Sequence, residues 1–90
     1  MAQSTIKFVG LKQLLLDLGF RETTRPGSHH LFRHDETDTE IVLPSYRANQ
    51  QVLPRHLLTV RIMLDAKGLL VADDFDQWVT GKAAQQPATG

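Results

Sequence analysis

Several features that this 90-residue chain lacks narrow what it can be. It has no cysteine, which excludes disulfide bridges and cysteine-ligated zinc. No apolar run approaches the ~20 residues of a membrane-spanning helix, and the N-terminus lacks the basic-then-apolar order of a secretion signal. Its ten basic and ten acidic residues cancel, so a surface that binds nucleic acid must be local. We therefore expect a soluble, cytoplasmic protein without membrane contact.

The length and the apolar spacing predict one small domain over residues 1–80 and a disordered tail over residues 81–90. A first helix is expected within residues 4–20, capped by Ser4 or Thr5 and stopped by Gly19. Its apolar stripe of helical period is formed by Phe8, Leu11, Leu15 and Leu18.

Three short alternating segments, residues 20–25, 29–34 and 39–44, are separated by turn residues and predict an antiparallel meander. A second helix is expected from Pro54 to a stop at Gly68. A short third helix, residues 72–81, would be capped by Asp73. The sequence thus predicts an α+β fold of order α-β-β-β-α, with a three-stranded antiparallel sheet, two helices on one face and a short C-terminal helix.

Side chains alternate along a strand, which divides residues 29–34 into two groups: His30, Phe32 and His34, and His29, Leu31 and Arg33. Burying Phe32 offers up to ~2–3 kcal/mol and favours the first group as the inward one. His29 and Arg33 would then lie on the open face, and His30 at the core edge beside a backbone group. If Leu31 points inward instead, the roles are exchanged. His34 and His56 are expected to be solvated.

Four segments in order, "LLLDLGF", "RPGSHHLFRH", "IVLP" and "LPRHLLTVRIMLDAKGL", resemble the HicA-like toxins of bacterial toxin–antitoxin pairs. The resemblance covers residues 8–69. It implies the double-stranded-RNA-binding-like fold and cleavage of mRNA by an endoribonuclease (an mRNA interferase) that uses no metal or other cofactor. It also implies a HicB-like antitoxin as the partner that covers the active face. The histidine after Gly-Ser, His29, would be catalytic, with its neighbour His30 as the alternative.

The chemistry of these residues agrees with that implication. An imidazole that titrates near neutral pH can take the proton of a ribose 2′-hydroxyl or protonate the leaving oxygen. Backbone N–H groups after a glycine can hold a phosphate, and an aromatic ring can stack on a base. The predicted RNA contacts are Arg25, Gly27, Ser28, Arg33, Tyr46 and Arg47.

Two alternatives remain open. Tyr46 and Arg47 can equally belong to an ordinary loop. The whole domain can also be a non-catalytic RNA- or protein-binding module of the same fold, which the neutral net charge and the acidic stretch at residues 35–40 favour. The Gly-Ser-His element favours the enzyme. A zinc site built from His29, His30 and His34 is disfavoured because alternation separates the first two, and we expect no metal.

Overall fold

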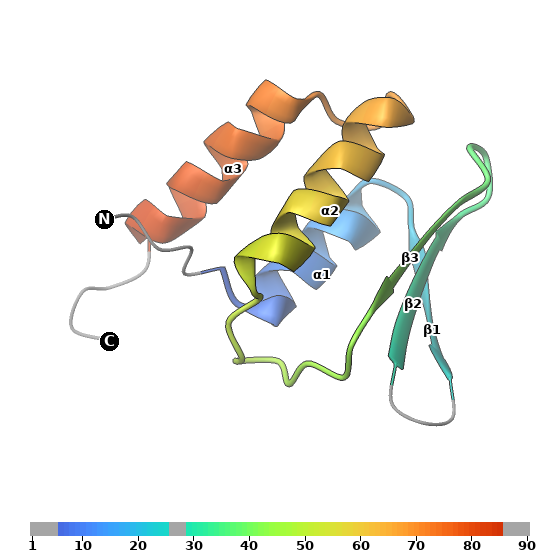
Figure 1. Ribbon diagram of the computed structural model, residues 1–90, viewed down its shortest axis with the longest axis horizontal. Helices are drawn as coiled ribbons and strands as arrows, with labels where there is room; N and C mark the ends of the chain where they lie inside the picture. The colour runs from blue at the N-terminus through green and yellow to red at the C-terminus, as the bar shows by residue number, and fades with distance from the viewer. Residues whose placement is uncertain (1–5, 26–28, 86–90) are drawn as a thin grey trace.

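The computed structural model describes residues 6–25 and 29–85, and it contains one antiparallel sheet and three helices. The strands pair in the order β1-β2-β3. In chain order the elements are α1 (Phe8–Asp17), β1 (Arg21–Arg25), β2 (His29–His34), β3 (Thr39–Leu43), α2 (Pro54–Ala66) and α3 (Ala72–Gln85). Figure 1 shows three layers: the sheet, then α1 and α2, then α3. The predicted α+β class and the meander are confirmed.

The core lies between the sheet and the two central helices, where the inward residues of every element meet. Phe32 is fully buried, so the arrangement with Phe32 inward is confirmed. The strands contribute Phe32, Ile41 and Leu43; the helices contribute Phe8, Leu11, Leu15, Leu57, Val60, Leu64 and Phe75. Three of the four residues of the predicted stripe on the first helix are among them. Burial of this apolar surface is the main force that holds the layers together.

The start of α1 differs from the prediction. The helix begins at Phe8, and Lys7 is its N-cap without a side-chain hydrogen bond. Ser4 and Thr5, the predicted caps, lie outside the described residues. The first N–H groups of a helix have no partner within it. Here the Phe8 N–H donates to the carbonyl of Gln50 at 2.8 Å, and the next N–H donates to the carbonyl of Ala48 at 2.9 Å. The loop before α2 therefore caps α1.

The ends of α1 and α2 follow the prediction. Gly19 has φ +102° and Gly68 has φ +71°, the left-handed values that glycine adopts without strain. The Phe20 N–H donates to the Leu15 carbonyl at 3.0 Å and so closes α1. A side chain at Gly19 would also stand 3.2 Å from the ring of His34.

The third helix is longer than predicted. α3 extends to Gln85 and buries Phe75 in the common core, so the expected domain boundary at residue 80 falls inside a helix. Residues 86–90 of the predicted tail lie outside the described residues. Asp73 is in the first turn of α3 and does not precede it as a cap. Among the described residues, no helix is long and apolar enough to cross a membrane.

Candidate functional site on the open face of the sheet

The adjacent histidines at the start of β2 lie on opposite faces of the sheet. His29 is exposed on the open face, together with Arg33, while His30 is partly buried on the face that the helices cover. The backbone register places Arg25 of β1 directly opposite His29. No hydrogen bond joins the His29 imidazole to another described residue. The ring is therefore exposed to solvent, and no other described residue uses either of its nitrogens.

Two of the predicted phosphate contacts, Gly27 and Ser28, lie outside the described residues. Arg25 is placed by its backbone only. Arg33 shares the face of His29 but lies four residues along β2, about 13 Å away at ~3.3 Å per residue. The open face therefore has two ends: a histidine end at His29 and a hairpin end at Arg33.

His30 contacts three groups from three different segments. Its Nδ1 lies 2.8 Å from Glu22 Oε2 on β1, and its Nε2 lies 3.2 Å from the Tyr46 carbonyl oxygen. Its ring packs on Phe8 of α1 with centroids 4.5 Å apart. Both polar partners are acceptors, so both contacts are hydrogen bonds only when each ring nitrogen carries a proton. The expectation of a core-edge histidine bonded to a backbone group is confirmed.

Glu22 completes this network and was missed at the level of sequence. Burial by itself raises the pKa of Glu22, but hydrogen bonds from Lys12 and His30 more than offset that effect and hold the pKa below its ordinary 4.5. The Lys12 Nζ is 2.9 Å from the second carboxylate oxygen. The alternation of side chains along β1 could have revealed it. Glu22 pairs with Phe32 of β2, so both side chains lie on the inward face of the sheet. A carboxylate on that face needs a partner.

The hairpin end of the open face is an ion-pair network around Arg33. Its guanidinium contacts Asp38 at 2.6 Å, Asp35 at 2.8 Å and Glu40 at 3.3 Å. Arg21 contacts the same Asp35 at 3.0 Å. These pairs raise the pKa of Arg33 and lower the pKa values of Asp35 and Asp38. Arg33 is therefore neutralised by acid from the β2–β3 turn, which limits its use as a phosphate contact.

Tyr46 is not an exposed stacking residue. Its ring is 7% exposed and stacks on Phe8 at 5.6 Å. Its hydroxyl accepts from the Leu53 N–H at 2.9 Å and donates to His56 Nδ1 at 2.5 Å. The prediction that Tyr46 stacks on an RNA base is corrected: the ring is part of the core, because an aromatic residue next to a loop can fold back under it. His56, which was expected on the surface, is partly buried and bonded to this hydroxyl.

Arg47 behaves differently from its neighbour. Its side chain is exposed and lines a polar hollow with Ser45, Asn49 and Gln50. Among the described residues, Arg47 takes part in no ion pair. Arg47 therefore remains available as a cation for a phosphate.

His34 was expected to be solvated and is in fact buried, with 6% of its surface exposed. Its ring packs on Phe20 at 5.2 Å, and its Nδ1 lies 2.9 Å from Thr37 Oγ1. The closeness of Gly19 leaves room for the ring, which sequence spacing did not reveal. The described residues contain no group of three or more histidine or acidic side chains that could hold a metal ion.

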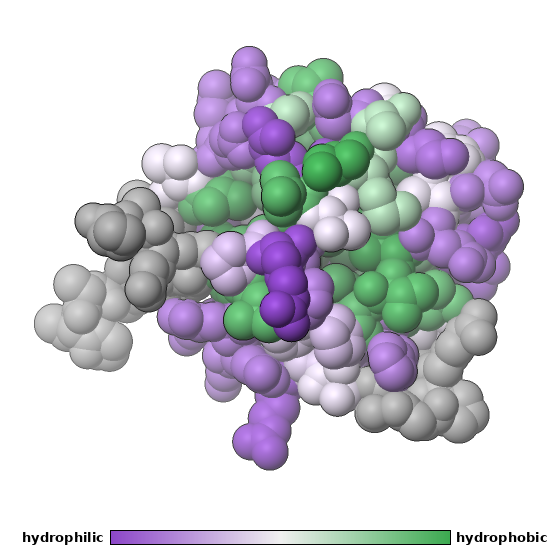
Figure 2. All heavy atoms as spheres, in the orientation of Figure 1, coloured by the Kyte–Doolittle hydropathy of each residue, from purple (hydrophilic) through white to green (hydrophobic). Residues whose placement is uncertain are grey.

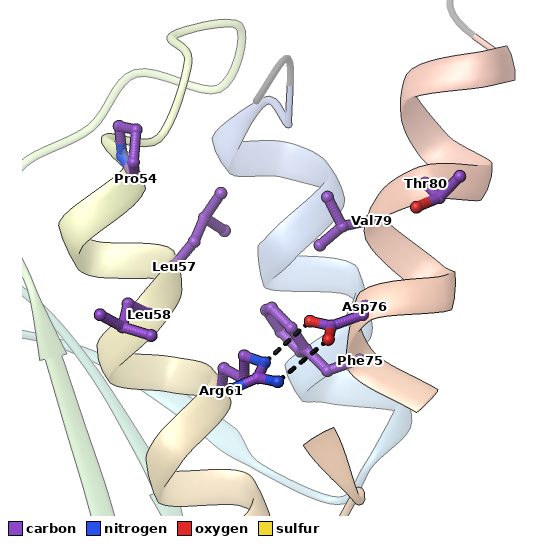
Figure 3. A pocket seen from close by; sticks show the side chains of 8 residues that line it. All are labelled: Pro54, Leu57, Leu58, Arg61, Phe75, Asp76, Val79 and Thr80. Carbon is purple, nitrogen blue, oxygen red and sulfur yellow. Dashed lines mark hydrogen bonds and ion pairs between the residues drawn. The ribbon is translucent and has the colours of Figure 1, made fainter. Parts of the chain in front are cut away.

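An apolar groove lies away from the sheet, between α2 and α3 (Figure 3). Its volume is about 380 Å³. The residues that line it are Pro54, Leu57, Leu58, Arg61, Phe75, Asp76, Val79 and Thr80. Arg61 and Asp76 bridge the two helices with contacts of 2.8 and 3.0 Å.

In comparisons with known proteins, no family model, no curated protein and no solved structure matches this chain. The resemblance to HicA-like toxins consequently stays a prediction from the sequence. The functional argument rests on the geometry of the open face.

Proposed function

We propose that this protein is a HicA-like cytoplasmic toxin that cleaves mRNA without a metal, with His29 as its catalytic residue. One observation carries the proposal: His29 is exposed at the start of β2, opposite Arg25, with neither ring nitrogen bonded to another described residue. Its neighbour His30 has both nitrogens occupied. A proton-transfer group must reach its substrate within hydrogen-bond distance, and of the two histidines only His29 meets that requirement.

The reaction needs no oxidant or cofactor. The ribose 2′-oxygen bonds to the adjacent phosphorus, the bond to the 5′-oxygen breaks, and the products are a 2′,3′-cyclic phosphate and a 5′-hydroxyl. His29 either removes the 2′-hydroxyl proton or supplies the proton to the departing oxygen. Arg25 and Arg47 are the proposed phosphate contacts, together with the backbone of Gly27 and Ser28. A HicB-like antitoxin is the proposed partner that covers this end of the sheet.

The test is cleavage of a defined mRNA fragment by purified protein in the presence of EDTA. The wild type is expected to produce fragments with cyclic phosphate ends. His29→Ala is expected to cut about 10²–10³-fold more slowly, the size of one lost proton-transfer group. Thr23→Ala is the matched control, because Thr23 is exposed on the same face and has no proposed role. Equal cleavage by wild type and His29→Ala would remove His29 from the mechanism.

A second candidate function is a non-catalytic binding module. The network that neutralises Arg33 favours it, since three carboxylates at the hairpin end repel an RNA backbone and suit a protein surface with basic residues. In the same assay this reading predicts a folded wild-type protein that leaves the RNA intact. A basic partner retained at low salt and released at high salt would then support it.

A further inference from the structure

The exposed side of α2 carries a line of apolar residues among its polar ones, although a surface helix normally places polar residues there. Leu58 is 52% exposed and Ile62, one turn later, is 56% exposed. Pro54 is exposed one turn before Leu58. Hydrophobic residues accordingly gather over α2 on the side turned to the viewer in Figure 2. Three apolar residues at a spacing of four form a continuous stripe along one side of the helix.

The stripe is flanked by two charges without ion-pair partners. Arg55 lies three residues before Leu58, and Asp65 lies three residues after Ile62. Neither forms an ion pair within the described part of the chain, whereas Arg61 on the neighbouring side of α2 is paired with Asp76 on α3. Asp65 uses one oxygen to accept the Ala72 N–H at 3.3 Å. The stripe thus carries a positive charge at its start and a negative charge at its end, and among the described residues neither belongs to an ion pair, although Asp65 also attracts Arg61 at longer range.

We propose that this stripe binds a second copy of the same chain, with the two α2 helices antiparallel across a twofold axis. Arg55 and Asp65 are equally far from the midpoint between Leu58 and Ile62. Antiparallel packing therefore puts Leu58 of each copy against Ile62 of the other, and Arg55 of each copy beside Asp65 of the other. This self-complementarity is what a twofold interface requires, because the same patch must fit itself.

The contact is small. α2 has 13 residues and is about 20 Å long at 1.5 Å per residue. A standard interface buries about 800 Å² per partner, and one helix face of this length offers less. We therefore expect a reversible dimer with a dissociation constant on the order of 10–100 µM. The proposal does not depend on the ribonuclease function, because α2 and the open face of the sheet are separate surfaces (Figure 1).

Charge reversal tests the pairing by sedimentation equilibrium. The wild-type mass is expected to rise with concentration from 10.1 kDa towards about twice that value. Arg55→Asp and Asp65→Arg each place two like-charged pairs across the interface and are expected to weaken the dimer about tenfold or more. The double variant restores opposite charges and is expected to return to within about threefold of the wild type.

Two controls keep this test specific. Arg47→Asp makes the same charge change in an exposed loop and is expected to leave the dimer unchanged. Arg55→Asp puts a negative charge in the first turn of α2, where the helix dipole favours it, so a loss of folding does not explain a weaker dimer. A wild type that stays at 10.1 kDa up to millimolar concentration overturns the proposal and leaves the stripe to a different protein.

The absence of cysteine allows the register to be tested as well. Mixed Leu58→Cys and Ile62→Cys chains bring the two thiols face to face, and we expect them to form a disulfide faster than either variant alone. In each single variant the two thiols are offset by four residues, about 6 Å along the helix axis. Equal rates in the mixture and in the single variants, or a double charge reversal that stays as weak as the single ones, would contradict the antiparallel pairing.

Discussion

His29 and His30 are adjacent, yet they stand in two different environments. His30 faces the helices and holds Glu22, the Tyr46 carbonyl and the Phe8 ring. His29 faces solvent on the open side of the sheet and contacts none of these. The difference comes from strand alternation alone. Two identical side chains in sequence can therefore have different roles: His30 contributes contacts to the fold, and His29 presents an exposed imidazole beside it.

The largest expected difference between the two histidines is in stability. His30→Ala removes two hydrogen bonds, one of them to a carboxylate, together with ring packing on Phe8, and is expected to lower the free energy of unfolding by about 2–3 kcal/mol. His29→Ala removes no hydrogen bond, ion pair or ring contact with another described residue and is expected to change the free energy of unfolding by less than about 0.5 kcal/mol. Urea denaturation followed by circular dichroism measures both.

The same pair separates a structural role from a catalytic one. His30→Gln can still form one of the two hydrogen bonds. Its free energy of unfolding is expected to lie between those of the wild type and His30→Ala. Cleavage of RNA by the His30 variants should follow their folded fraction, while His29→Ala should lose cleavage with its stability intact. Equal stability of His29→Ala and His30→Ala would show that the contacts around His30 contribute nothing.

Much of the fold could be predicted because it depends on local rules. Alternation put His30, Phe32 and His34 on one face, and the size of Phe32 favoured that face as the inward one. Gly19 and Gly68 ended their helices, and Pro54 began one. What could not be predicted depends on contacts between distant segments. The start of α1 is set by carbonyls of the loop before α2, which no reading of residues 4–8 could supply.

In the candidate site, too, the features that depend on local rules could be predicted and those that depend on distant contacts could not. The exposure of His29 follows from the strand pattern, and Arg33 was correctly placed on its face. Its neutralisation by Asp35, Asp38 and Glu40 depends on how the β2–β3 turn folds back. The burial of Tyr46 and His34 and the hydrogen bond of the partly buried His56 likewise depend on tertiary packing, because each ring has a polar group that a neighbour from another segment can bond.

The next expected effect is the pH dependence of the network around His30. The pKa of Glu22 is lower in the folded protein than its ordinary 4.5, so the unfolded chain binds that proton more readily. The stabilising contribution is therefore complete above pH 4.5 and is lost as the pH falls through the lowered pKa. Glu22→Gln is expected to be less stable by about 1 kcal/mol at pH 7.

Comparing the two proteins isolates Glu22 from the other carboxylates. Urea unfolding from pH 7 to pH 3 should show the difference between wild type and Glu22→Gln shrinking as the pH falls below 4.5. Asp35, Asp38 and Asp76 also have lowered pKa values, but they titrate in both proteins and cancel in the difference. A gap that stays constant across this range would mean that Glu22 is not held by Lys12 and His30.

The smallest expected effect concerns the hairpin end of the open face, where Arg33 is paired with acid. Asp38→Asn removes its closest partner, at 2.6 Å, and asparagine accepts the left-handed backbone of this position, φ +53°. The freed guanidinium is expected to tighten binding of single-stranded RNA about threefold and to steepen its salt dependence by up to about 0.7 in the log–log slope.

Asp76→Asn is the matched control for this last comparison. It makes the same change in net charge and also releases an arginine, Arg61, but between α2 and α3 and not on the sheet. RNA affinity measured by fluorescence anisotropy at several salt concentrations should therefore rise with Asp38→Asn and change less with Asp76→Asn. An equal gain in both variants would mean that net charge, and not the position of Arg33 on the open face, governs attraction of the RNA backbone, because a long-range field acts alike from either side of so small a domain.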